Sequence, residues 1–152
     1  MKRFHFQLEG LLRMRTVEAD RQRGQLQKCM AAIVAVHDEI AAIEQKRAEQ
    51  FEMRSQGGTG PLSMEDVKNQ QRYLNVLHRE EATLSAKLPQ LQQELALAQQ
   101  RHGHALKEQR AVERLREQRY EEYVIEAQRH DMGQLDETSQ QLRQLRSEEV
   151  TS

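Results

Sequence analysis

Apolar residues repeat at 3.5-residue intervals along two long segments, and this repeat constrains the sequence more than any other feature. In the first segment, with Leu26 as heptad position a, the apolar positions continue without a break to Ile43. The residues between them are Cys29, Ile33, Val36 and Ile40. A stripe with this spacing predicts the seam of a coiled coil. Toward the ends of the segment the stripe is less regular, because Arg15, Gln22 and Arg47 occupy seam positions.

The second segment carries a matching stripe. Its members are Leu74, Leu77, Leu84, Leu88, Leu91, Leu95, Ala98 and Ala105. Glu81 and His102 interrupt it, and beyond Leu106 the register drifts, which indicates a stutter or a change of packing partner. Pro89 lies inside the stripe and removes one helical hydrogen bond. It could divide the helix in two, but the stripe continues in phase across it, so we expect a kink.

A glycine-rich break separates the two segments. Residues 56–63 contain three glycines and a proline, which favour a chain reversal and stop a helix. Ser63 can cap a new helix, and Glu65 and Asp66 complement its positive end. The sequence therefore predicts an all-α fold in a single domain, residues 1–152. One helix covers about 5–55, a loop 56–63, and a second helix about 64–146.

Antiparallel pairing about a loop centred near Thr59 brings the two stripes together. It sets Leu26 near Gln92, and Ile33 near Leu84. We therefore expect an antiparallel two-helix coiled-coil hairpin that is monomeric, with the longer second helix overhanging. Everything after about residue 114 then has no partner on the first helix. A parallel homodimer is the rival arrangement, but it leaves the glycine-rich break without a role.

Composition excludes several classes of protein. Apolar residues make up 37% of the chain and aromatic residues 4%, which is too little for a thick globular core or a sheet protein. The net charge of −1 argues against a protein that coats nucleic acid. The single Cys29 excludes an internal disulfide. No apolar run is long enough to span a membrane, and we interpret the N-terminal residues as mature protein, not a signal peptide.

No pattern in the sequence predicts catalysis. The glycine-rich break lacks the Gly-Lys-Ser/Thr ending of a phosphate loop. His102 and His104 are two apart and would point to different faces of a helix, which disfavours a shared metal ion. His130 fits an exposed polar face, and Cys29 fits a small seam residue. We expect no catalytic residue, no cofactor and no metal, and therefore no enzyme.

Two segments are better explained by binding. The N-terminal cluster consists of Phe4, Phe6, Leu8, Leu11, Leu12 and Met14. The residues that fit one helical face are Phe4, Leu8, Leu11 and Leu12, whereas Phe6 and Gly10 do not. The cluster could contact a partner or pack on residues 109–115. The second segment, residues 115–124, carries Arg119, Tyr120 and Tyr123, residue types that anchor interfaces. The alternative is an amphipathic tail that pairs with itself or frays.

These two segments together resemble the flagellar export protein FliJ family. The opening Phe4-x-Phe6-x-Leu8-x-x-Leu11-Leu12 is similar to the start of the family. The helix from Glu113 through Tyr120-Glu121-Glu122-Tyr123 to Leu135-Asp136-Glu137 is similar to its C-terminal signature. The resemblance covers nearly the whole chain.

The resemblance implies a non-enzymatic stalk of the flagellar type III export apparatus, similar to the γ subunit of rotary ATPases. The implied partners are the hexameric export ATPase FliI with its regulator FliH, the export gate FlhA, and export chaperones that it would escort. The implied location is cytoplasmic, peripheral to the inner membrane at the flagellar base, without insertion into the membrane. The ATPase-binding residues would be Phe4, Phe6, Leu8, Leu11, Leu12, Arg119, Tyr120, Tyr123, Leu135, Asp136 and Glu137. The gate-binding residues would be Ile43, Arg47, Phe51, Tyr73 and Leu77, of which Ile43 and Leu77 also fit the seam.

Three other functions remain open on the sequence. The stalk of a virulence type III secretion injectisome would work by the same mechanism with a different ATPase. A generic coiled-coil scaffold would need no ATPase. A nucleic-acid binder would use the small positive excess of residues 1–24, but the acidic C-terminus opposes it.

Overall fold

A computed structural model describes residues 2–56 and 63–151 of the chain. Within these ranges the protein consists of two α-helices and no strand. Helix α1 spans Glu9–Gln56 and helix α2 spans Met64–Thr151, so α2 is the longer by far. This confirms the predicted all-α fold with a longer second helix. None of the described helical sequence is long and apolar enough to cross a membrane.

Contacts divide the chain into two compact units, to which both helices contribute. The hairpin unit is Asp20–His104. The terminal unit combines Met1–Ala19 with Ala105–Ser152, so it contains both ends of the chain. Each unit is described by itself below.

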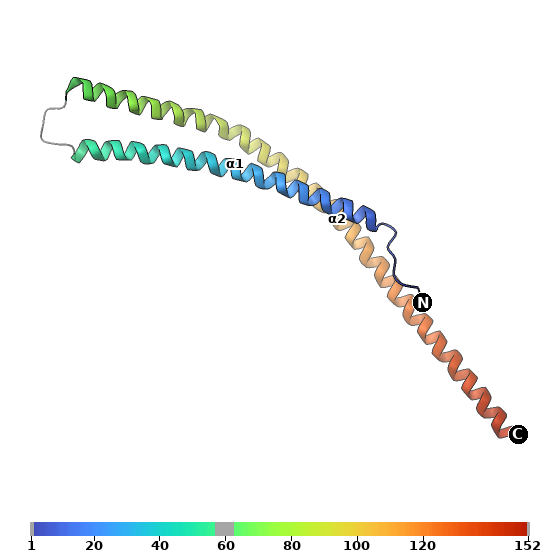
Figure 1. Ribbon diagram of the computed structural model, residues 1–152. Helices are drawn as coiled ribbons and strands as arrows, with labels where there is room; N and C mark the ends of the chain where they lie inside the picture. Colours follow the sequence, from blue (N-terminus) through green and yellow to red (C-terminus); the bar gives the residue numbers. More distant parts are fainter. Residues whose placement is uncertain (1, 57–62, 152) are drawn as a thin grey trace. The chain divides into compact units, whose positions relative to one another are not determined.

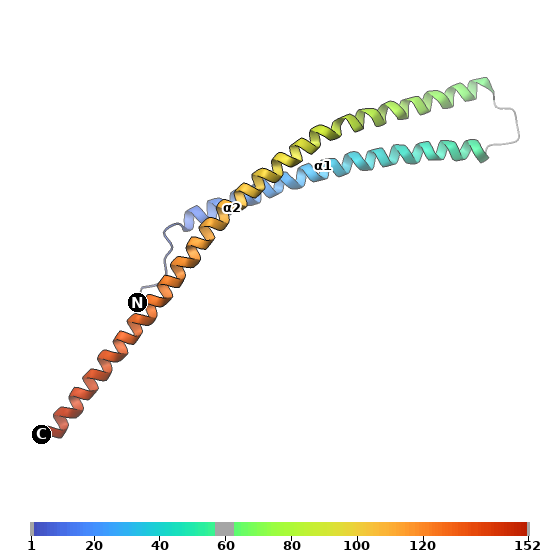
Figure 2. The same ribbon diagram turned by 180° about the vertical axis from the view of Figure 1, so that it is seen from behind.

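The hairpin unit is an antiparallel pair of helices. The cyan part of α1 and the green part of α2 lie side by side in Figure 1, and Figure 2 shows the same pairing from behind. The seam between them buries Val36, Ile43, Leu77 and Ala98. All four belong to the predicted stripes, so the heptad pattern of the sequence forms the core of this unit.

A charged pair crosses the seam at the position where the second stripe is interrupted. Glu81 accepts a hydrogen bond from the Arg47 guanidinium, and both side chains are partly buried. Nearby, Gln70 donates to the carbonyl oxygen of Gln50 at 3.4 Å. Arg47 itself occupies a seam position of the first stripe, so two departures from the apolar repeat compensate each other. Paired polar groups in a coiled-coil seam specify which residues face each other more than they add stability.

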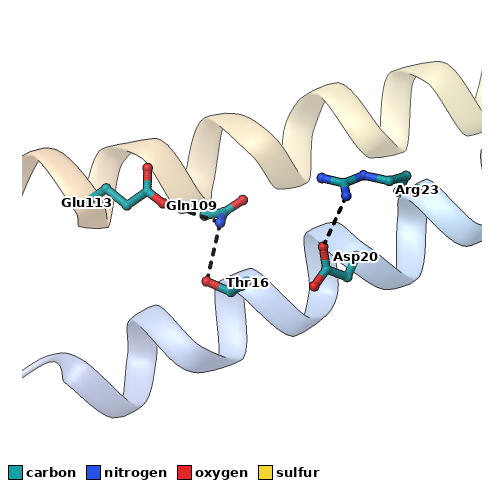
Figure 3. A network of polar contacts seen from close by, with 5 residues as sticks. All are labelled: Thr16, Asp20, Arg23, Gln109 and Glu113. Carbon is teal, nitrogen blue, oxygen red and sulfur yellow. Dashed lines mark hydrogen bonds and ion pairs between the residues drawn. The ribbon is translucent and has the colours of Figure 1, made fainter.

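In the terminal unit, polar pairs likewise join the start of α1 to residues 105–116 of α2. Arg15, at a seam position, forms an ion pair with Glu108. Gln109 donates from Nε2 to the Thr16 hydroxyl and to a Glu113 carboxylate oxygen, each at 3.3 Å (Figure 3). Figure 3 also shows the ion pair between Asp20 and Arg23 on one turn of α1 in the hairpin unit. Polar contacts therefore accompany the apolar seam in both units.

The pairing in the terminal unit corrects the predicted register. Counting from a loop centred at Thr59 sets Arg15 opposite Gly103 and Thr16 opposite His102. The observed partners, Glu108 and Gln109, lie farther along α2. In the hairpin unit Arg47 likewise pairs with Glu81, whereas the same count sets it opposite Gln71, so side-chain pairing departs from a constant register in both units.

The helix ends follow local capping rules in part. Ser63 caps α2 through its hydroxyl, which accepts from the Asp66 amide at 3.1 Å, as predicted.

Pro89 lies within α2, which is continuously helical on both sides of it, so the helix is not divided there. Helix α1 begins at Glu9 instead of about residue 5, and α2 ends at Thr151 instead of about 146. The predicted loop, apart from Gln56 and Ser63, lies outside the described residues.

Replacing Leu77 by alanine should strongly destabilise the protein. Its side chain is only 2% exposed, and truncation of a buried leucine costs about 2–5 kcal/mol. The matched control is Leu97→Ala, because Leu97 lies in the same unit but is 50% exposed. Urea unfolding followed by far-UV circular dichroism should show a large loss for Leu77→Ala and a small one for Leu97→Ala. Equal losses would contradict the assigned seam.

Candidate partner-binding surfaces

Three aromatic rings form a cluster in the terminal unit. Phe4 contacts Tyr120 with ring centroids 5.2 Å apart in an edge-on arrangement, and Tyr123 at 5.4 Å. The ring centroids of the two tyrosines, which lie on the same helix, are 6.3 Å apart. Edge-on and tilted aromatic pairs of this kind contribute about 0.5–1.5 kcal/mol beyond the area they bury. The cluster therefore holds the N-terminal segment against α2.

The residues before α1 form this contact because they are not helical. Residues 2–6 have no regular structure and residues 7–8 form a turn, closed by a hydrogen bond from the Glu9 amide to the Phe6 carbonyl at 3.2 Å. Tyr123 donates its hydroxyl proton to the Lys2 carbonyl at 2.9 Å. Both views show this dark blue segment beside the orange part of α2 (Figures 1 and 2). We call residues 2–8 the N-terminal strap.

The strap corrects two predictions. We expected Phe4, Leu8, Leu11 and Leu12 on one helical face with Phe6 off it. In the structure Phe4 and Leu8 precede the helix, and Phe6 is buried. Because this segment is not helical, Phe4 can contact Tyr120 and Tyr123 while Phe6 is also buried. We also expected α2 to be unpaired after about residue 114. The strap covers α2 as far as Tyr123, so the uncovered part begins later.

A cavity lies between the strap and α2. Its volume is about 530 Å³, and α2 lines it with Leu115, Arg119, Glu122, Tyr123 and Glu126. Lys2, Arg3 and His5 line it from the strap. Arg119 and Glu122 form an exposed ion pair at 3.6 Å. At the first turn of α1, Glu9 pairs with Arg116 at 3.1 Å. The aromatic cluster is thus surrounded by charges of both signs.

The predicted ATPase-binding residues fall into three groups. Phe6 is buried, and Phe4, Leu11, Leu12 and Tyr123 are half-buried. Tyr120, Arg119 and Leu8 are exposed around the aromatic cluster. Leu135, Asp136 and Glu137 are exposed farther along α2. Five of these residues line one cavity, namely Phe4, Phe6, Leu8, Arg119 and Tyr123, and Tyr120 contacts Phe4. The third group lies beyond the strap.

The predicted gate-binding residues all lie in the hairpin unit. Ile43 and Leu77 are buried in its seam, as their heptad positions allowed, and Arg47 is engaged by Glu81. Phe51 and Tyr73 are exposed. The sequence did not single out a groove of about 610 Å³ that Ile43 also lines, whose other lining residues include Lys46, Val76 and Arg79. These three residues are polar or off the stripe, so only the folded pair of helices brings them together.

No group of three or more metal-ligating side chains occurs among residues 2–56 and 63–151. His102 has a buried Nε2 without a hydrogen-bond partner. His102 lies at a seam position, where it interrupts the apolar stripe of the second segment.

The protein consists of two antiparallel helices, and both units carry exposed aromatic and apolar residues. These features define a coiled-coil protein whose candidate sites are surfaces that bind other proteins. Comparison with models of protein families matches residues 4–148 to the flagellar FliJ protein family. The chain therefore belongs to the FliJ family, and its function is associated with flagellar protein export. The match begins at Phe4 and includes the aromatic cluster and nearly all of α2. No curated protein and no solved structure matches the chain.

Phe4→Ala should loosen the N-terminal strap without unfolding the helices. The variant loses both ring contacts, so only the buried Phe6 and the hydrogen bond of Tyr123, which contributes about 1 kcal/mol, still hold the strap. Hydrogen–deuterium exchange should become faster in residues 4–8 and stay unchanged in the hairpin unit. Phe51→Ala is the matched control, because Phe51 is an exposed phenylalanine of the other unit. Unchanged exchange of the strap in Phe4→Ala would show that the aromatic cluster does not hold it.

Proposed function

We propose that this protein is the non-enzymatic stalk that couples the flagellar export ATPase to the export gate. In this proposal the terminal unit inserts into the hexameric ATPase FliI and promotes its assembly and turnover. The hairpin unit contacts the gate protein FlhA. Contacts with FliH and the escort of export chaperones belong to the same proposal, as does a position at the cytoplasmic side of the inner membrane.

The observation that carries the proposal is the composite surface of the terminal unit. The strap and α2 come from opposite ends of the chain, yet Phe4, Tyr120 and Tyr123 form one cluster. Tyrosine and arginine are the residues that most often dominate binding energy in interfaces, and both surround this cluster. A surface built from both termini supports a role in which the end of a rod is inserted into a ring.

The mixed charge of this surface supports the same role. Arg116 and Glu9 form one exposed ion pair, and Arg119 and Glu122 form another. Charges of both signs favour specific orientation and rapid association more than tight binding. A stalk must leave each ATPase subunit again during turnover, so a contact without tight locking suits it.

A separate surface in the hairpin unit supports the contact with the gate. Phe51 and Tyr73 are exposed aromatic residues, and their unit contains none of the aromatic cluster of the terminal unit. Because Ile43 and Leu77 are buried, the gate contact in this proposal relies on Phe51 and Tyr73. The two partners therefore bind residues that can be changed independently.

Tyr120→Ala and Tyr73→Ala should separate the two activities. Tyr120→Ala removes the exposed ring of the terminal unit and should reduce stimulation of ATP hydrolysis by FliI about tenfold or more, as an interface anchor would. Tyr73→Ala should leave this stimulation intact and weaken binding to the cytoplasmic part of FlhA. Each variant is thus the control for the other. Full stimulation by Tyr120→Ala would contradict the assigned ATPase surface.

A version that ends at residue 114 tests the mechanism more broadly. It keeps the whole hairpin unit, Asp20–His104, but removes the α2 residues on which the strap packs. We expect it to bind FlhA and to give no stimulation of ATP hydrolysis. Stimulation of the flagellar ATPase but not of an injectisome ATPase by the full chain would distinguish the two export systems. If the full chain changes neither rate at a large excess, a scaffold or chaperone-escort role replaces the stalk.

A further inference from the structure

Beyond the strap, α2 carries a stripe of exposed apolar side chains. Its members are Ile125, Met132, Leu135 and Leu142, which are between 48% and 67% exposed. Ile125 and Met132 are seven residues apart, as are Leu135 and Leu142, so the stripe has positions a and d of a heptad repeat. The strap contacts α2 at Tyr120 and Tyr123, which precede these residues in the chain. We call residues 121–146 the overhang.

The strap does not occupy the overhang's apolar stripe. Ile125 is two residues from Tyr123, and residues two apart on a helix point in nearly opposite directions. Since Tyr123 faces the strap, Ile125 faces away from it. A second helix could therefore pack on the stripe while the strap stays in place.

We propose that the overhang pairs with the overhang of a second copy of this chain in an antiparallel coiled coil. Antiparallel helices place each a residue against a d residue of the partner. One register does this throughout: Ile125 faces Leu142 of the second copy, and Met132 faces Leu135. The two-fold axis then lies between Gly133 and Gln134. The paired segment is about 39 Å long.

Charges beside the stripe complement each other in this same register. Arg129 and Asp136 occupy equivalent flanking positions, so each Arg129 faces Asp136 of the second copy, and this pair occurs twice. At both ends Glu121 meets Arg146 of the second copy. All four side chains are exposed in the single chain. Charges that match at several positions at once select one register from the many that an apolar stripe alone would allow.

Parallel pairing of the overhang fails on the same residues. It would place Arg146 on Arg146 and Glu121 on Glu121 at seam positions. Flanking Asp131 would then face Asp136 of the second copy. Like charges at these positions are destabilising, so the pattern selects the antiparallel dimer.

The pairing should be reversible. Gln128 faces Ser139 of the second copy in two of the layers, and these polar layers weaken a short coiled coil. The dimer thus differs from the monomeric hairpin that the sequence led us to expect, and it forms as concentration rises. Where the proposed function holds, the dimer also hides Leu135 and Asp136, two residues of the ATPase-facing set.

Sedimentation equilibrium of the full chain tests the proposal. The unaltered protein should shift from monomer to dimer over a broad concentration series. Arg129→Glu alone and Asp136→Arg alone should each remain monomeric, because each homodimer would contain two like-charge pairs. An equimolar mixture of these two variants should recover the dimer, because both flanking pairs then have opposite charges.

The controls separate loss of pairing from loss of folding. Far-UV circular dichroism should show full helicity for each variant, and Arg110→Glu, an exposed reversal outside the overhang, should dimerise like the unaltered protein. A monomer at all concentrations overturns the proposal. If the single charge reversals still dimerise, the antiparallel register is wrong. It is also wrong if the mixture of the two variants stays monomeric. Protection of the overhang from hydrogen exchange only after addition of the export ATPase would assign the stripe to that partner instead.

Discussion

In each unit a narrow seam between two helices supplies most of the burial. Two helices can cover each other along one stripe only, and no second layer exists among the described residues to cover the other faces. The side chains that become fully buried are few, with Leu77 the most enclosed and alanines at several other positions. Each seam position therefore matters more than in a globular core. Charged pairs such as Arg47 with Glu81 occupy some of these positions and fix which residues face each other.

The same constraint explains why the candidate binding residues are exposed and apolar. A helix in a two-helix pair leaves most of its circumference in solvent, so apolar residues off the seam stay accessible. Phe51 and Tyr73 in the hairpin unit are of this kind, and Tyr120 is the equivalent in the terminal unit. Such residues do not destabilise the seam, because they lie outside it. They can be selected for partners without loss of the fold, which suits a protein of the export apparatus.

The sequence predicted the helices well because their signals are local or periodic. The apolar stripe around Val36 and the Ser63 cap both follow from residue spacing. It failed at the strap, where Phe4 and Phe6 fit a helical pattern only in part and tertiary contact decided the outcome. It singled out Tyr123 but not its partner, since the carbonyl of Lys2 is a backbone group that carries no signal in the sequence.

If both proposals hold, the overhang serves two contacts in turn. Its apolar stripe is too polar in its Gln128 layers for a permanent dimer and too regular to be a solvated face. A weak dimer lowers the concentration of free overhang, and any partner that binds only the free form must compete with self-pairing. A partner present at high local concentration would do so easily. On this argument self-pairing would keep Leu135 away from nonspecific apolar contacts until an ATPase ring displaces the second copy.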